Sequence, residues 1–373
     1  MKQSSFLLIF VLAAFSAFNI SAQIHISTIE PGKLQKSLGG LLDSLSAKDE
    51  FSGVVLIAKG ENTVFAKAYG AADKSAKRMN TIDTKFNLGS CNKMFTGVAI
   101  AQLAEQGKLS FGDKVGKYLP DYPNETVREN VTIRQLLTHT SGLGDFFNPK
   151  FDEARTRLRT VASYFPLFAS DSLQFAPGEK YQYSNAGFVV LGAIVEKVSG
   201  EDYYSYVKKH IFIPAGMTGT GFYGDDTVSE KQSAAIGYTD MGPDHRRMEG
   251  GQRNPNTDIL EPRGGPAGGG YSTAGDLLKF RLALFGNKLL NAAYTDSVVT
   301  GKVPTRFGLY GYGFGNERVP DGFVIGHTGG APGVYARLDM YRESGHTVVV
   351  LSNFDPPAPG DQTLTDRIHQ LLH

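Results

Sequence analysis

Strand-like runs stand at the two ends of this chain and are missing from its middle. Residues 51–70 predict two strands joined by a turn at Gly60-Glu61-Asn62, and residues 323–327, 334–341 and 347–351 predict three more. We therefore expect both ends of the chain to join one antiparallel sheet, whose strand order the sequence leaves open.

The middle of the chain has a helical pattern instead. Apolar residues recur at helical spacing over residues 131–137, 151–168 and 186–198, with polar loops between these segments. Further helices are expected toward the two ends, over residues 34–45, 90–106, 275–285 and 361–372. The predicted fold class is α/β: an antiparallel sheet covered by helices (an α/β sandwich) with an inserted, mostly helical subdomain. An active site is expected in the cleft between the two.

The first 22 residues are typical of a signal peptide. Lys2 precedes 13 residues from Phe6 to Phe18 that are apolar apart from Ser16, and Ala22 is a small residue before a plausible cut. This run is shorter than the ~20 residues that a membrane span needs, so no stable membrane anchor is expected. We expect a periplasmic or secreted protein.

The mature chain is expected to form one unit over residues 23–373. Its α/β part would comprise about residues 30–90 plus 265–373, and its helical part about residues 91–264.

Charge and cysteine content narrow the choice of partners. Removing residues 1–22 takes one lysine and no acid from 38 basic and 37 acidic residues, which leaves 37 of each. This balance gives no reason to expect a nucleic acid, and a small-molecule or peptide substrate is the expected partner. The single cysteine, Cys91, excludes an internal disulfide. No metal site and no cofactor are expected, and the oligomeric state stays open.

Ser90 and Lys93 form the first pattern that could carry chemistry. They open the helical pattern at residues 90–106 and lie three residues apart, which places them on one face of a helix. A lysine amine kept neutral there can accept the hydroxyl proton, which makes the serine a nucleophile without a histidine. The helix N-terminus would also stabilise a developing oxyanion. Because Ser-x-x-Lys is common by chance, a helix N-cap with a solvated lysine stays open.

Tyr183 and Asn185 form the second pattern. In an extended segment, residues two apart face the same way, so both side chains would point into one cleft. A phenol beside an ammonium has a lowered pKa and can carry a proton. The alternative interpretation makes Tyr183 a core aromatic and Asn185 a helix N-cap.

The third pattern is the glycine-rich segment from Gly326 to Gly333, at the end of one expected strand. Glycines there would let a substrate backbone lie along the strand and would free an N–H to point at an oxyanion. An ordinary glycine-rich hairpin with an exposed His327 is the alternative.

In this order, Ser90-x-x-Lys93, Tyr183-x-Asn185 and His327-Thr328-Gly329 resemble the three signatures of the serine β-lactamase and penicillin-binding-protein-like superfamily. The nearest relatives in the resemblance are class C β-lactamases, DD-peptidases and esterases. The resemblance covers about residues 30–372 and includes LLTHTSGL at 136–143.

The resemblance implies an acyl-enzyme mechanism. Ser90 would attack a carbonyl, and Lys93 would activate it. Tyr183 would carry protons to the leaving group and later activate the hydrolytic water.

The resemblance also implies the binding groups. Asn185 would hold a substrate amide, and the N–H groups of Ser90 and Gly330 would form the oxyanion hole. The edge of the strand would be lined by His327, Thr328 and Gly329.

Two departures from the commonest family pattern bear on the substrate. His327 stands where a β-lactamase has a lysine that helps to hold a carboxylate, and Gly330 lacks a hydroxyl that some DD-peptidases place there. We therefore expect hydrolysis of an amide or peptide, with a D-configured residue as one option, or of an ester. A β-lactamase and a non-turning-over acyl sensor on the same fold remain the alternatives.

Three further features are expected to be structural. Cys91 adjoins Ser90, but helix neighbours point about 100° apart, so its thiol cannot replace the hydroxyl. His139 lies in a segment that the resemblance marks as structural. Arg155, Arg157 and Arg159 are expected on a solvated helix face, with a position beside the cleft as the alternative.

Overall fold

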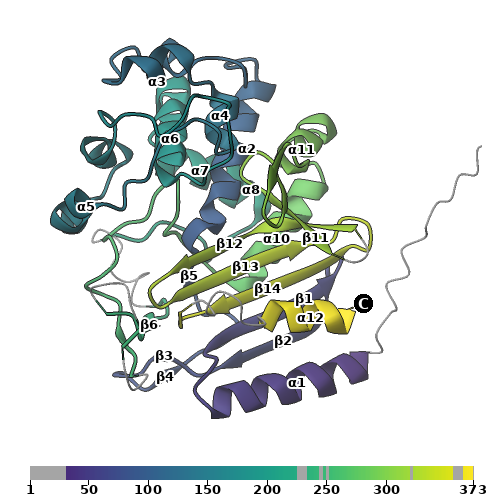
Figure 1. Ribbon diagram of the computed structural model, residues 1–373. Helices are drawn as coiled ribbons and strands as arrows, with labels where there is room; N and C mark the ends of the chain where they lie inside the picture. Colours follow the sequence, from purple (N-terminus) through teal and green to yellow (C-terminus); the bar gives the residue numbers. More distant parts are fainter. Residues whose placement is uncertain are drawn as a thin grey trace, which may run out of the picture.

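Figure 1 shows the path of the chain, for which the computed structural model describes residues 31–224, 233–242, 247–248, 252–319, 322–355 and 364–372. The expected signal peptide, residues 1–22, lies outside the described residues. None of the helices in the described ranges is both long enough and apolar enough to cross a membrane.

Within the described residues, one antiparallel sheet of eight strands forms the centre of the molecule (Figure 1). In spatial order its strands are β2 (Asn62–Tyr69), β1 (Gly53–Lys59), β14 (His346–Ser352), β13 (Val334–Met340), β12 (Gly322–Ala331), β11 (Gly315–Val319), β10 (Gly308–Tyr310) and β9 (Val303–Thr305). Because β1 pairs with β14, the two ends of the chain do join one sheet, and this prediction is confirmed. The short strands β9, β10 and β11 extend the sheet beyond the five that were predicted.

Side chains along the central strands alternate between two hydrophobic cores. On β1, Val54 and Leu56 face one core, whereas Val55 and Ile57 face the other. Helices cover both faces of the sheet, with α1 (Pro31–Ala47) and α12 (Leu364–Leu372) over the second core (Figure 1). A strand covered on both faces needs apolar residues at every position, which explains the unbroken run from Val54 to Ile57.

The other face of the sheet is covered by α2 (Asn92–Glu105), α10 (Ala274–Phe285) and α11 (Ala292–Val299) (Figure 1). Helix α2 lies between the sheet and the helical part, and its residues 92–104 are all buried. A helix enclosed on every side has no solvated polar face, and the polar residues of α2 (Asn92, Lys93, Thr96 and Gln102) are buried together with its apolar ones.

The remaining helices gather above one end of the sheet (Figure 1). Five of them begin at side-chain caps, as the preference for these residue types at helix starts predicts: Asn124, Thr132, Asn148, Ser184 and Asp202. The helices of this group are α3 (Glu125–Asn130), α4 (Ile133–Leu137), α5 (Pro149–Ala154), α6 (Asn185–Ser199), α7 (Tyr203–Val207) and α8 (Ile213–Ala215). Shorter helical turns lie at Gly89–Cys91, Val115–Lys117, Arg155–Arg157, Val161–Leu167 and Lys208–Phe212.

Three two-stranded ladders complete the described structure. They pair β3 (Ala71–Asp73) with β4 (Arg78–Met79), β5 (Phe86–Asn87) with β8 (Tyr271–Ser272), and β6 (Tyr238–Thr239) with β7 (Asn254–Pro255).

The prediction of one continuous helix over residues 151–168 is wrong. Helix α5 begins at the Asn148 cap and ends at Ala154, and a separate helical turn starts after the Thr160 cap. Leu158 between them is extended, and its side chain is buried. Pro166 has no N–H to donate within a longer helix. The apolar spacing reflects burial of two short pieces rather than one long helix.

Two helical glycines provide a test of the packing around α2. A Cβ at Gly97 would lie 2.0 Å from the Tyr312 carbonyl oxygen, whereas a Cβ at Gly40 on α1 would meet nothing within 4 Å. Gly97→Ala should therefore lower the free energy of unfolding by ~1–3 kcal/mol, because the helix must move away from the Tyr312 backbone. Gly40→Ala should leave it unchanged or raise it by up to ~1 kcal/mol. Urea denaturation measures both, and equal effects would contradict the close packing.

Candidate active site

Ser90 lies in the helical turn Gly89–Cys91, which leads directly into α2. Gly89 has φ +46°, and a Cβ at this position would lie 2.8 Å from the Gly330 nitrogen. Glycine tolerates both this backbone conformation and this close approach. The Ser90 turn is therefore held against the edge of the sheet at β12.

Lys93 lies one helical turn after Ser90, and its side chain is fully buried. Its Nζ lies 3.1 Å from the Ser90 Oγ, 2.6 Å from the Asn185 Oδ1 and 2.6 Å from the Ala267 carbonyl oxygen. The last two atoms can only accept hydrogen bonds. A neutral amine has two N–H groups, and these two acceptors use both of them. The lone pair is then left for the Ser90 hydroxyl.

Burial lowers the pKa of Lys93 to about 7, because an ammonium loses its hydration there. The negative charge of Asp145 opposes this shift, since it favours the protonated form. Near neutral pH a substantial fraction of Lys93 is therefore the neutral amine that can accept a proton from Ser90.

Asp145 ties the lysine to two other groups of the site. Its Oδ2 accepts from the Asn185 Nδ2 at 2.7 Å, and its Oδ1 accepts from the Phe147 backbone N–H at 3.2 Å. The Asn185 amide is thereby oriented, because its nitrogen faces a carboxylate and its oxygen faces Lys93. The side-chain nitrogen of Asn185 carries two N–H groups, and only one of them is used in the bond to Asp145. The other can donate to a substrate carbonyl.

Tyr183 lies beside the lysine, with the Lys93 Nζ 4.7 Å from the centre of its ring. Burial raises the pKa of Tyr183, although a hydrogen bond with the Ser90 hydroxyl lowers it in part. The expectation of a lowered pKa is therefore wrong. Loss of hydration dominates, and Lys93 carries less charge than a solvated lysine would. Tyr183 is a neutral phenol that can donate a proton to a group at Ser90.

His139 holds the segment that carries Tyr183. Its carbonyl oxygen accepts from the Gln182 N–H at 2.9 Å, and its Nδ1 accepts from the Ser184 N–H at 3.0 Å. The centroids of the His139 and Tyr183 rings lie 4.3 Å apart. His139 has φ +57°, and burial lowers its pKa well below the usual range, so its ring is neutral. The interpretation of His139 as structural fits this position, which fixes both flanks of Tyr183.

His327 is bonded through both ring nitrogens. Its Nδ1 lies 2.6 Å from the Thr328 carbonyl oxygen and its Nε2 lies 2.8 Å from the Tyr310 hydroxyl. The carbonyl requires a proton on Nδ1, so the Tyr310 O–H donates to Nε2. Burial lowers the pKa of His327 to about 3, and the charge of Lys93 contributes. His327 is therefore a neutral group supported by Tyr310, and it is not a cation.

The edge of β12 is open where it passes Ser90. A two-residue turn joins Ala331 to Val334, which makes these two residues a hydrogen-bonded pair. Because such pairs alternate along an antiparallel ladder, the backbone of Gly329 also bonds to β13, whereas the N–H of Gly330 points away from β13. Strand β11 ends before this point, at the pair of Gly315 with Gly326. A Cβ at Gly329 would lie only 3.0 Å from the Ser90 nitrogen. The N–H of Gly330 therefore faces the cleft close to the N–H of Ser90.

A cleft of about 1170 Å³ runs from Ser90 along the helical part. Ser90, Tyr183, Asn185 and Gly330 line it, whereas His327, Thr328 and Gly329 are not among its lining residues. The structure thus brings the first and second motifs together with Gly330. The His327 side chain supports the site from beside it.

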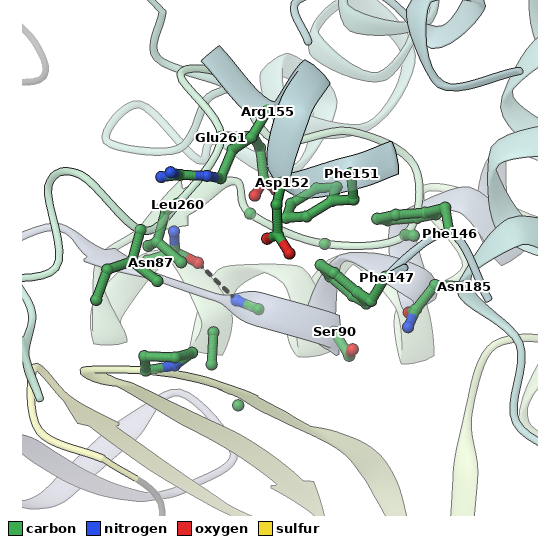
Figure 2. A pocket seen from close by; sticks show the side chains of 18 of the residues that line it. Asn87, Ser90, Phe146, Phe147, Phe151, Asp152, Arg155, Asn185, Leu260 and Glu261 are labelled. Atoms are coloured by element: carbon green, nitrogen blue, oxygen red, sulfur yellow. Dashed lines mark hydrogen bonds between the residues drawn. The ribbon is translucent and has the colours of Figure 1, made fainter. Parts of the chain in front are cut away.

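Aromatic and charged side chains line the rest of the cleft. Figure 2 shows Phe147 near Ser90 and Asn185, Phe151 on the far side of Phe147, and Arg155 and Glu261 farther away. Arg155 donates to the Asp258 carbonyl, and burial raises the pKa of Glu261. Arg155 therefore lies beside the cleft, as the alternative interpretation had it. Its neighbours Arg157 and Arg159 do not line it.

Cys91 points away from the cleft into the core beneath β12. Its thiol is fully buried and lies 3.1 Å from the His327 carbonyl oxygen. Burial raises its pKa to about 12, so the group is a neutral thiol. It fills space and has no access to a substrate at Ser90. Within the described residues, no three side chains of His, Cys, Asp or Glu are grouped so that they could hold a metal ion.

Sequence reasoning missed Asp145 and Tyr310. Asp145 follows the LLTHTSGL segment by two residues, so it lay next to a recognised segment. Neither residue has a periodic or spacing signal of its own. Their contacts to Asn185 and His327 join segments that only the fold brings together.

Comparison with known proteins finds relatives over most of the chain. The family model described as Beta-lactamase matches residues 40–373. A penicillin-binding protein from Bacillus subtilis (strain 168) is 30% identical over 357 residues, which cover 91% of this chain and 76% of that protein.

Solved structures show the same fold. A penicillin-binding protein from Bacillus halodurans has a TM-score of 0.78 and 34% identity, with 88% of this chain and 98% of that chain covered. A D-amino acid amidase from Ochrobactrum anthropi SV3, complexed with L-phenylalanine amide, has a TM-score of 0.75 and 24% identity. In that comparison 91% of this chain and 97% of that chain are covered.

The pKa of Lys93 can be tested through the reactivity of Ser90. The rate of covalent labelling by a fluorophosphonate should rise with pH, with a midpoint about 7, and level off above it, because only neutral Lys93 accepts the serine proton. Ser90→Ala should not label, and Lys93→Met should label slowly without this midpoint. A rate that does not depend on pH between about 5 and 9, or a midpoint near the usual lysine pKa of about 10.4, would contradict the account.

The role of Asp145 predicts the direction of a further shift. Asp145→Asn removes the charge that favours protonated Lys93, so the labelling midpoint should move to lower pH. Asp152→Asn is the matched control, because Asp152 also lines the cleft but does not contribute to the pKa of Lys93. A midpoint that moves upward in Asp145→Asn, or equally in both variants, would show that Asp145 does not act through its charge on Lys93.

Proposed function

The chain belongs to the β-lactamase family of serine hydrolases, and on that premise we propose that it is an exported enzyme that hydrolyses a neutral amide, peptide or ester through an acyl-enzyme on Ser90. Export rests on the pattern of the first 22 residues.

The observation that carries the proposal is the set of partners around the Lys93 amine. Two oxygen acceptors at 2.6 Å, on Asn185 and Ala267, use the two N–H groups of the neutral form. Its lone pair then lies 3.1 Å from the Ser90 oxygen, within reach of the hydroxyl proton. As Ser90 attacks the substrate carbonyl, its proton passes to Lys93, which becomes an ammonium.

Tyr183 completes the proton transfer in this proposal. Its neutral phenol shares the Ser90 hydroxyl with Lys93, so it can donate its proton to the leaving nitrogen or oxygen when the tetrahedral intermediate collapses. Lys93 returns a proton to the phenol oxygen and becomes neutral again. In deacylation the protons move in the opposite direction. Tyr183 takes the proton of the attacking water and passes its own proton to Lys93. The high pKa of Tyr183 makes Lys93, rather than a phenolate, the base.

The negative oxygen of the intermediate would be held by two backbone donors. The N–H groups of Ser90 and Gly330 lie close together at the cleft, and the Ser90 turn is the start of α2. Fixed N–H groups of this kind stabilise the transition state without reorganisation. The free N–H of Asn185 would hold a carbonyl of the substrate on the acyl side.

The neutral state of His327 supports a substrate without a carboxylate next to the scissile bond. Both of its nitrogens are engaged, and its pKa of about 3 leaves it uncharged at neutral pH. A buried cation would be needed to attract a carboxylate at that place. Penicillins and free C-terminal peptides are therefore disfavoured relative to amides and esters. The D-amino acid amidase shows that this fold can act on an amino acid amide.

A panel of substrates tests the proposal. Purified protein is given p-nitrophenyl esters, D- and L-amino acid amides, nitrocefin, and a D-alanyl-D-alanine peptide alongside its C-terminal amide. We expect turnover of an ester or amide, no preference for the free carboxylate, and complete loss of activity in Ser90→Ala. Tyr183→Phe should lower kcat on the order of 100-fold or more, because the proton donor is lost.

Each other outcome of this panel has a distinct meaning. Hydrolysis that survives in Ser90→Ala would overturn the assignment of the nucleophile. Labelling of Ser90 without turnover of any substrate would favour the acyl sensor. Efficient nitrocefin turnover with a marked preference for the free carboxylate would favour the β-lactamase alternative.

A further inference from the structure

The side of the cleft next to Ser90 carries an exposed aromatic ring. Phe147 is 57% exposed, and of the exposed large hydrophobic residues in the described ranges it alone lines the cleft. Exposed apolar surface inside a cleft is typical of a ligand contact, because the ligand covers it on binding.

Phe147 belongs to a group of packed aromatic rings. Its ring centroid lies 4.5 Å from that of Phe146 and 4.9 Å from that of Phe151, with which it makes an edge-to-face contact at 73°. Phe146 and Phe151 are buried, and Phe146 also packs on Tyr164. The group is therefore a rigid wall with one ring presented to the cleft.

The wall is fixed in position relative to the nucleophile by one carboxylate. Asp145 accepts from the Phe147 N–H with one oxygen and from the Asn185 Nδ2 with the other. Asn185 in turn accepts from Lys93. In Figure 2 the Phe147 side chain lies between Phe151 and the part of the cleft that holds Ser90 and Asn185. The distance from the aromatic wall to the reacting atoms is thus set by a short chain of hydrogen bonds.

We propose that Phe147, with Phe151 packed against it, forms a subsite for a bulky apolar group, preferably an aromatic ring, on the acyl side of the scissile bond. The inference rests on the proposed function, because it assumes an acyl-enzyme at Ser90. The acyl side follows from Asn185, whose free N–H would hold a carbonyl of the acyl portion beside this wall. A further ring fits here because aromatic rings prefer offset or edge-to-face contacts with each other.

The test compares two esters that share one leaving group. The kcat/KM for p-nitrophenyl phenylacetate should exceed that for p-nitrophenyl acetate in the wild-type protein. In Phe147→Ala it should fall on the order of 10- to 100-fold for the phenylacetate, mainly through KM, and stay within about twofold for the acetate. Phe147→Leu should retain much of the preference. Phe307→Ala is the control, since Phe307 is 68% exposed and lies outside the cleft.

Fluorophosphonates with an ethyl or a benzyl group provide a second readout, because labelling of Ser90 does not require turnover. Benzyl should label the wild-type protein faster, and Phe147→Ala should remove that advantage. A protein that labels or hydrolyses without any preference for the larger group would overturn the subsite alone. Equal losses for both esters in Phe147→Ala would also overturn it, since Phe147 would then act on the nucleophile. Absence of both labelling and turnover in the wild-type protein would overturn the proposed function and the subsite together.

Discussion

The burial of one lysine is the constraint on which the rest of the site depends. An amine without access to water keeps its charge only at a cost in free energy, and burial accordingly lowers the pKa of Lys93 to about 7. The surrounding groups fit the neutral form, with acceptors for two N–H groups and a hydroxyl for the lone pair. A solvated lysine at the same spacing from Ser90 would be protonated near pH 7 and could not take the serine proton.

The architecture explains how such a lysine can be accommodated. Helix α2 is enclosed between the sheet and the helical part, so a side chain on its first turn is buried wherever it points. The polar groups that meet Lys93 come from two distant segments of the chain. Asn185 starts α6 in the helical part, whereas Ala267 lies in the segment that leads to β8 and to α10. The site therefore exists only when both parts are assembled around α2, which links folding of the whole chain to chemistry at Ser90.

The sequence predicted those parts of the structure that local pattern determines. Strand-like apolar runs and turn residues identified the two N-terminal and three C-terminal strands, and the Ser90 and Tyr183 motifs were located by spacing. It could not predict effects that depend on burial. The pKa of Tyr183 rises where a neighbouring ammonium suggested a fall, because loss of hydration outweighs the charge of a lysine that is itself partly neutral. The hydrogen bond between Tyr310 and the neutral His327 ring crosses 17 residues of sequence with no spacing signal. The helix at 151–168 was mispredicted because buried side chains on two short pieces imitate helical spacing.

The protonation state of Lys93 in the folded protein is the most direct measure of the central claim. Protein labelled with ¹³C at the lysine Cε positions can be titrated by NMR, and the Lys93 signal is assigned by its loss in Lys93→Met. We expect one lysine that titrates with a midpoint about 7, because burial lowers the pKa of Lys93 to about that value. A Lys93 signal that titrates near the usual lysine pKa of about 10.4 would contradict the account, because Ser90 would then have no neutral base beside it.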